Sequence, residues 1–433
     1  MASVKVAPEN LEERLIFGAL VGTWGFYLLG ALYVVGPVLA MSLIGIYFWR
    51  CYASAWRPNT PQPAPVPLGV WVWLFGMGAM LVALLIAHIG EDLGFGQTLK
   101  SSIGWLKGWA LLALFPLAGA CLRIRPKLVI RAVGWFAVQT LALVPFLVLA
   151  ALLHLPPKLY VSPLQIIGGP GPEFFSVYLY IVDPSNGASR WQFVTPWAPA
   201  AGMLGYLIFI LAFFESDRRF RSLGFIAAVT ICLMTKSRMA MLFLAIYPPL
   251  LWTAARLARP ALLAVGAAGA AIAGIVAGPI IDAVASAIQA FRSARADSTR
   301  VREALGRIAI DRWWDEAPIW GHGIVHRGPH HVEFMPIGSH HTWFGLLFVK
   351  GIVGLLALAL PIAWTMVEMV LLSQVSALGR LGLSVCVMLV FYSFGENLEI
   401  LAYLFWPGMV LLGAAFGEAA RPQRAALPDQ GAR

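Results

Sequence analysis

The sequence predicts an all-α, polytopic integral membrane protein with about 12 transmembrane helices and one large helical loop outside the membrane. The 433 residues are 60% hydrophobic and only 12% charged, and the mean hydropathy is +0.77. Apolar runs of spanning length recur along the chain, and basic residues gather in alternate connections between them. A soluble core could not bury this much apolar surface.

Each predicted span lies on an apolar run of roughly 20 residues. The first two runs are separated only by glycine and proline, so ten or eleven spans remain alternatives. Gly274 and Gly278 have GxxxG spacing, which predicts close packing of their helix against a neighbour. The predicted spans are 15–32, 34–50, 69–89, 104–122, 132–153, 197–214, 222–236, 238–255, 260–282, 343–368, 380–394 and 400–417.

The net charge of +10 favours a membrane topology and no nucleic-acid partner, because most positive residues lie in alternate loops. The polar start of the chain lacks a basic region and a cleavage site, so we expect the first apolar run to remain as a helix. Twelve spans place both termini in the cytoplasm. Residues 1–433 then form one transmembrane domain, with two long outer loops at 154–196 and 283–341. The loops predicted to be cytoplasmic carry Arg50, Arg57, Arg123, Arg125, Arg131, Arg218, Arg219, Arg256 and Arg380.

The second outer loop is rich in arginine, against the charge rule. Asp297 or Ser298 is predicted to cap a helix starting near Thr299, and Arg300 and Arg307 would share one face of that helix. Guanidinium groups bind phosphate oxygens in a bidentate fork, so these residues, with Arg302, are predicted to bind a pyrophosphate. The alternatives are a solvated basic face or contacts with anionic lipid headgroups.

Six of the eight histidines lie between residues 322 and 341, just before the span at 343–368. Imidazole has an ordinary pKa near 6.5, which suits proton transfer near neutral pH, so we expect an active site at the membrane interface. Glycine and proline within this stretch disfavour a helix with zinc-ligand spacing, and the four cysteines are scattered singly. We therefore predict neither a metal nor a disulfide. The zinc ligands considered are His322, His326, His330, His331 and Glu333.

Three motifs in order resemble the O-antigen polymerase and O-antigen ligase superfamily of bacterial envelope glycosyltransferases. The first is a Ser-Arg pair entering a helix, here ending at Arg238. An intramembrane arginine is a functional candidate, and a snorkelling anchor is the alternative. The second is an arginine, Arg300, about 18 residues before the Pro-x-x-Gly-x-Gly element in PIWGHG. The third is His340, followed after His341 by the Gly-x-x-Gly element in GIVGLL. The resemblance covers roughly residues 190–360.

The resemblance implies transfer of a glycan from undecaprenyl pyrophosphate to a sugar hydroxyl at a periplasmic site, without cofactor or metal and with inversion. It assigns pyrophosphate binding to arginines and proton transfer to a histidine. His341 stands where the family usually has a small polar residue, which leaves open whether His340 or His341 acts. The predicted pyrophosphate ligands are Arg238 and Arg300, with Arg302 and Arg307 as lesser candidates, and candidate sugar-binding residues are Arg190, His322, His326, Glu396 and Glu399.

Three functions fit these features. The first is a polymerase that joins lipid-linked repeat units into exopolysaccharide, capsule or O-antigen. The second is an O-antigen ligase that moves polymer onto lipid A-core or another acceptor, and the third is a transporter or flippase of a lipid-linked glycan. All three imply a multi-pass protein of the bacterial inner membrane. The expected partners are the bilayer and the lipid-linked oligosaccharide, with a flippase and a chain-length regulator as further candidates.

Overall fold

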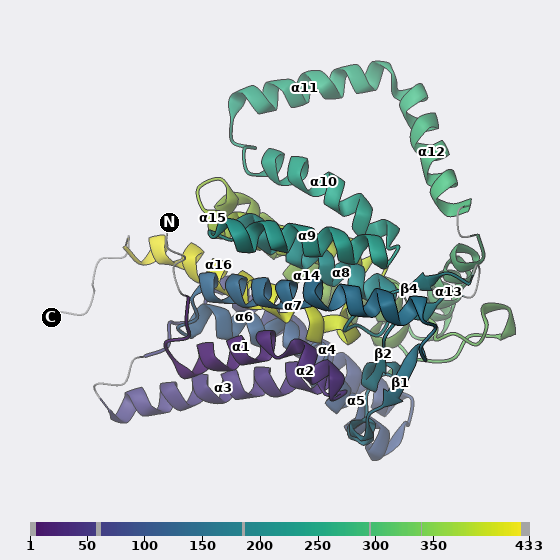
Figure 1. The fold of residues 1–433 in the computed structure, drawn as a ribbon, viewed down its shortest axis with the longest axis horizontal. Helices are drawn as coiled ribbons and strands as arrows, with labels where there is room; N and C mark the ends of the chain where they lie inside the picture. Colours follow the sequence, from purple (N-terminus) through teal and green to yellow (C-terminus); the bar gives the residue numbers. More distant parts are fainter. Residues whose placement is uncertain (1–5, 58–61, 184–186, 294–295, 339, 426–433) are drawn as a thin grey trace.

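The computed structural model describes residues 6–57, 62–183, 187–293, 296–338 and 340–425. Long helices run side by side along most of the described chain, which confirms the predicted all-α membrane class (Figure 1). The α-helices are α1 (Leu11–Val21), α2 (Thr23–Leu28), α3 (Leu32–Trp56), α4 (Leu68–Gly90), α5 (Gly94–Lys107), α6 (Leu111–Cys121), α7 (Pro126–Leu152), α8 (Ala198–Phe214), α9 (Arg218–Met234), α10 (Arg238–Ala254), α11 (Pro260–Ile275), α12 (Ala277–Ser293), α13 (Ala296–Glu316), α14 (Thr342–Ser373), α15 (Ala377–Ser393) and α16 (Leu398–Ala425).

Six segments of the described chain are long and apolar enough to cross a membrane, or seven if α11 and the start of α12 count as one bent span. Helices α8, α10 and α15 are apolar but shorter, with 17 residues each. Every predicted span overlaps a helix. The structure thus establishes several spans, and the count of twelve stays a prediction. The six segments are Leu32–Trp56, Leu68–Gly90, Gly94–Cys121, Pro126–Leu152, Thr342–Ser373 and Leu398–Ala420.

The prediction of one helix at 260–282 is wrong in shape, because α11 and α12 meet at an angle of 89°, although the bent pair can still form one span. The helix ends where Pro279 follows, and a proline both lacks an N–H and clashes with the carbonyl four residues earlier. A Cβ built at Gly274 or Gly278 meets no atom within 4 Å. The predicted close packing of this GxxxG pair is therefore also wrong within this chain.

The basic connections and the outer loops lie at opposite ends of the molecule. Arg125 donates to Glu13 (Nη2–Oε2, 2.7 Å) and Arg50 to Glu12 (2.7 Å), which ties two of the basic connections to the N-terminal segment. The four strands and α13 lie at the other end of the helices (Figure 1). This arrangement agrees with the predicted alternation of loops. Which end faces the cytoplasm stays a prediction.

The first long loop contains the only strands among the described residues. Strand β1 (Lys158–Val161) pairs antiparallel with β2 (Ser176–Tyr178), and β3 (Ile181–Val182) with β4 (Ser189–Arg190). The Tyr27 hydroxyl accepts from the N–H of Tyr178 (2.8 Å) and donates to its carbonyl (3.1 Å), which fixes this loop to α2. Short 3₁₀ turns lie at Pro163–Ile167 (η1), Pro172–Phe175 (η2) and His330–Val332 (η3).

Helix α16 lies in the core, with side chains such as Leu401 and Leu411 fully buried. It packs along α6, while α14 packs along α4 and α15. The second outer loop also departs from prediction in one detail, since α13 begins at Ala296 and already includes the residues expected to cap it. Its apolar side packs through Val301 and Leu305 on Val332 of the following loop. These contacts hold α13 against the outer end of α14.

Candidate active site

The outer loop inserts its backbone into a break in α14. The helix kinks at Gly351, whose φ of 60° and ψ of −162° are not helical. In a regular helix the carbonyls of Phe348 and Val349 would accept from residues four positions later. They accept instead from the N–H groups of His322 (2.9 Å) and Gly323 (2.9 Å) in the loop.

The other half of the break is completed in the same way. The N–H groups of Ile352 and Val353 would serve those two carbonyls in an unbroken helix. They donate instead to the loop carbonyls of Pro318 (3.0 Å) and Ile319 (3.3 Å). The loop therefore supplies both the donors and the acceptors that the kink leaves open, so no buried backbone group in this exchange is left without a partner.

Glycine is required at both sides of this insertion. Gly321 has a φ of 71°, and a Cβ built there would lie 2.4 Å from the backbone nitrogen of Lys350. A Cβ at Gly351 would lie 2.2 Å from the carbonyl oxygen of Ile319. The Pro-x-x-Gly-x-Gly and Gly-x-x-Gly elements, far apart in sequence, are thus the two halves of one backbone contact.

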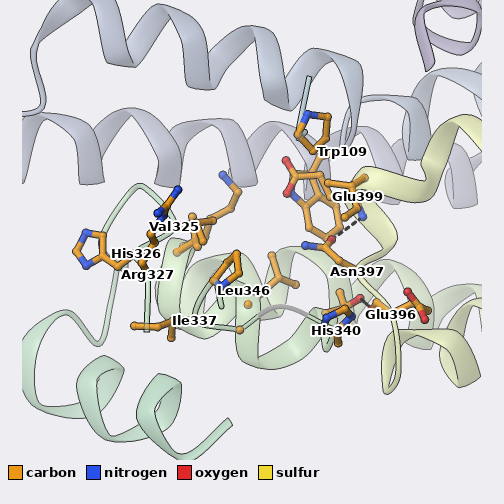
Figure 2. Close-up of a pocket in the computed structure, with 18 of the residues that line it drawn as sticks. Trp109, Val325, His326, Arg327, Ile337, His340, Leu346, Glu396, Asn397 and Glu399 are labelled. Carbon is orange, nitrogen blue, oxygen red and sulfur yellow. Dashed lines mark hydrogen bonds between the residues drawn. The ribbon is translucent and has the colours of Figure 1, made fainter. Parts of the chain in front are cut away.

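A cavity of about 600 Å³ opens beside this insertion. Its walls come from the loop before α14, from the outer part of α14, from the turn between α15 and α16, from the junction of α5 and α6, and from the first long loop and the start of α8. Figure 2 shows Trp109 and Glu399 together, with His340 and Glu396 nearby and His326 on the far side. Three carboxylates, those of Glu173, Glu396 and Glu399, therefore line the same cavity as the imidazoles of His326 and His340.

His340 is the histidine of the predicted pair that lines the cavity. Its backbone φ of 63° is left-handed. The ring lies edge-on to Trp197 with 6.4 Å between centroids. Burial lowers the pKa of His340 to about 4, and the charge of Arg302 acts in the same direction. The imidazole is therefore neutral and able to accept a proton at neutral pH.

His341 has a different position and partner set. It is the N-cap of α14, where its Nδ1 accepts from the N–H of Phe344 (3.3 Å). Its ring stacks on that of Phe344 at 3.8 Å. Burial lowers the pKa of His341 to about 4 as well. Because one ring nitrogen and one face are used to start the helix, the geometry favours His340 over His341 as the reacting group.

Glu396 is a buried carboxylate on the same side of the cavity as His340. It is 2% exposed and accepts a hydrogen bond from the indole Nε1 of Trp197 (2.9 Å). Burial raises the pKa of Glu396 to about 7, although Trp197 and the charge of Arg302 act against this rise. Trp197 thus lies between the carboxylate and the imidazole.

The four predicted phosphate-binding arginines occupy different positions. Arg302 acts electrostatically on both cavity residues, His340 and Glu396. Arg300, Arg302 and Arg307 are all exposed on α13, and none of them lines the cavity. A residue two positions along a helix points about 200° away, so Arg300 and Arg302 cannot both face the same site.

Arg238 begins α10, next to the turn that carries Glu396. A Cβ built at Gly395 would lie 2.3 Å from the Cε of Met239, the residue after Arg238. Ser237 caps the helix through its Oγ, which accepts from the N–H of Ala240 (3.5 Å). This cap fixes the start of α10, and therefore the backbone of Arg238, beside the turn that carries Glu396.

Of the predicted sugar-binding residues, His326, Glu396 and Glu399 line the cavity, and Arg190 and His322 do not. Arg190 donates to the carbonyl of Thr235 (Nη2, 2.9 Å) and is paired with Asp183, contacts that hold the first loop to α9.

His322 is likewise used within the protein. Its Nδ1 contacts the carbonyl of Phe348 (2.9 Å) and its Nε2 the carboxylate of Glu316 (2.7 Å). Glu316 in turn accepts from Arg312, and these two bonds lower the pKa of its carboxyl to about 2. In the described part of the chain no three potential metal ligands come together, and the side chain of His331 lies outside that part. The absence of a metal stays a prediction.

A comparison with known protein families gives a match over the part of the chain that contains the inserted loop. Residues 223–359 match the family model of the O-antigen ligases. This match confirms the resemblance to the O-antigen polymerase and ligase superfamily. The matched segment runs from α9 into α14, so it includes the inserted loop, the arginines of α10 and α13, and His340. No curated protein matches the chain.

Several cavity residues lie outside the three motifs that the sequence offered. Lys350 lines the cavity and is a charged residue inside an otherwise apolar run. Such a residue is a functional candidate that the sequence alone could have indicated, but it belongs to none of the three motifs. Arg327 lies among the histidines but belongs to no motif. Trp109 comes from a part of the chain over 200 residues away, at the junction of α5 and α6. Only the folded structure brings it to this site.

Proposed function

We propose that this protein is a membrane glycosyltransferase that moves a glycan from undecaprenyl pyrophosphate to a sugar hydroxyl at the outer face of the bacterial inner membrane. We further propose that the acceptor is another lipid-linked repeat unit, which makes the protein a polysaccharide polymerase. The observation that carries the proposal is His340, neutral and partly buried in a cavity beside the first turns of α14, with the charge of Arg302 acting on it.

In this mechanism His340 removes the proton from the attacking hydroxyl. An imidazole with a pKa of about 4 is a weak base when the site is empty. A bound pyrophosphate would offset the charge of Arg302 and bring negative charge close to the ring, which raises the basicity of His340. The base would then be strongest only when the donor is in place. Glu396 would stabilise the imidazolium that forms, across Trp197.

The arginines hold the leaving group. Pyrophosphate needs its negative charge stabilised as the bond to the sugar breaks, and preorganised guanidinium groups supply this without a metal. Arg302 and Arg238 are assigned to this role because one acts on His340 and the other lies beside the turn that carries Glu396. A single displacement with the hydroxyl on the face opposite the pyrophosphate inverts the anomeric centre.

The test is turnover of lipid-linked repeat units by purified protein in reconstituted membranes. His340→Ala should reduce turnover about 10²- to 10⁴-fold, the usual contribution of a general base, while the donor still binds. His341→Ala should lower stability by about 1 kcal/mol through loss of the cap, and His341→Ser should restore it. His330→Ala, in the exposed part of the loop, is the matched control. Normal turnover in His340→Ala would overturn the mechanism.

O-antigen ligation is the second candidate, and the description of the matched family favours it. Both reactions use the same donor, so the acceptor distinguishes them. A deletion strain that accumulates single repeat units would indicate a polymerase. A deletion strain that keeps full-length polymer on its lipid carrier would indicate a ligase.

A further inference from the structure

The cavity has a second polar group that the proposed proton transfer does not use. It consists of Trp109, Lys350, Asn397 and Glu399, and all four line the cavity. Figure 2 shows Trp109, Asn397 and Glu399 close together. A Cβ built at Gly108 would lie 2.6 Å from Cγ of Glu399, so only glycine lets this junction approach the start of α16.

The first observation is a buried donor without a good partner. Trp109 is 2% exposed, and its Nε1 makes no hydrogen bond of acceptable geometry within the described part of the chain, although Glu399 lies beside it. Buried indole N–H groups usually find an acceptor. An acceptor supplied by a ligand in the cavity would complete this site.

The second observation is a buried cation. Lys350 is 3% exposed and has no hydrogen bond or ion pair to another described residue. Its charge and that of Glu399 attract each other, but the two groups are not in direct contact. A charge buried in this way is costly unless something pairs with it. A ligand that binds between the Lys350 ammonium and the Glu399 carboxylate would explain why these two buried charges lie near each other without direct contact.

We infer that Trp109, Lys350, Asn397 and Glu399 form the binding site for the acceptor sugar. Neighbouring hydroxyls of a sugar ring both donate and accept, so one ring can bridge an ammonium and an indole N–H on one side and a carboxylate on the other. The amide of Asn397 offers both roles, and its Oδ1 already accepts from the N–H of Glu399 (3.0 Å).

The assignment to the acceptor follows from the positions of the other groups. The phosphate-binding arginines lie on α10 and α13 and do not line the cavity. His340 must reach the hydroxyl of the acceptor, and His340 lines the same cavity as this group. The inference rests on the proposed function, since it names the acceptor side of that reaction.

The experiment measures binding of two probes to the purified full-length protein. One probe is the free repeat-unit oligosaccharide released from the lipid carrier of the native host, and the other is undecaprenyl pyrophosphate without sugar. Lys350→Met and Glu399→Gln should each weaken oligosaccharide binding about 10- to 100-fold, the range expected for a lost hydrogen bond to a charged group. Binding of undecaprenyl pyrophosphate should be unchanged.

Two controls distinguish binding of the acceptor sugar from a purely structural role of Lys350 and Glu399. Glu368→Gln removes a carboxylate on α14 that does not line the cavity and should leave oligosaccharide binding unchanged. If Lys350 and Glu399 served only to stabilise each other, each single variant would lose thermal stability and the double variant would regain it, without an effect specific to the oligosaccharide.

The outcomes are distinct from those that test the overall function. Unchanged oligosaccharide affinity in both single variants, or equal losses for both probes, would overturn the acceptor site even if the wild-type protein transfers glycan. Failure of the wild-type protein to bind oligosaccharide would also overturn it. Absence of transfer by the wild-type protein, with oligosaccharide binding intact and sensitive to these variants, would instead count against the proposed reaction.

Discussion

Replacing Glu396 with glutamine should stabilise the folded protein at alkaline pH while reducing glycan transfer. Burial raises the pKa of this carboxyl from its ordinary 4.5 to about 7. The folded state therefore holds the proton more tightly than the unfolded state, and the protein loses stability as the pH rises from about 4.5 to 7. The gap between these values corresponds to roughly 3 kcal/mol. Glutamine does not ionise, so the variant escapes this loss.

The assay is thermal unfolding in detergent at pH values from 5 to 8, for the wild-type protein and for Glu396→Gln. The variant should gain a few degrees in Tm relative to the wild type as the pH rises, because each kcal/mol shifts Tm by roughly 2 °C or less in a chain of this size. Titration of His340 and His341 occurs in both proteins and largely cancels in the comparison. Glu333→Gln, in the exposed loop, should follow the wild type.

Two results would refute this reasoning. A Tm difference that stays constant from pH 5 to 8 would show that Glu396 is already ionised in the folded protein at pH 5. Full transfer activity in Glu396→Gln would show that the carboxylate does not support proton transfer to His340. The first result tests the electrostatics of the site, and the second tests its chemistry.

Three further predictions concern topology, electrostatics and the inserted loop. Asp315→Cys, in a protein whose exposed Cys51 is replaced by serine, should react with an impermeant thiol reagent in cells with a permeabilised outer membrane. Labelling only after lysis would show that the loop 283–341 faces the cytoplasm. Arg302→Ala should lower turnover about 10²-fold and Arg307→Ala less than about threefold, and equal losses would contradict the different positions of the two arginines. Gly321→Ala should lose more than about 2 kcal/mol of stability, since a left-handed backbone already costs 1–2 kcal/mol; an unchanged Tm would mean that the loop is not inserted in α14.

The fold class could be predicted from the sequence because hydropathy and charge act locally along the chain. The membrane-spanning run at 69–89, for example, lies within the single helix α4. The span at 260–282 could not be predicted, because a proline sets where a helix breaks but packing sets the angle. The prediction from GxxxG spacing failed for a related reason, since small residues permit close packing only when a neighbour is present.

Part of the candidate site could be predicted, because titratable residues next to apolar runs can be recognised in the sequence. His340 and Glu396 were both identified, and the structure brings them to one cavity. The order of importance among arginines was not predictable, because Arg300 carries the motif whereas the charge that acts on His340 is that of Arg302. Trp109 could not have been identified from spacing at all, since its place in the site depends on the packing of α6 against α16.

The backbone exchange between the outer loop and α14 has a consequence for how this protein can be divided. A chimera that grafts the loop of a relative onto this scaffold must reproduce not only its side chains but the four hydrogen bonds that residues 318–323 share with α14. A graft that misses this register would leave open donors and acceptors at the membrane edge, where water cannot fully replace them. The extramembrane loop and its membrane helix are therefore exchangeable only as one module, with the junction placed before Pro318 and beyond Val353.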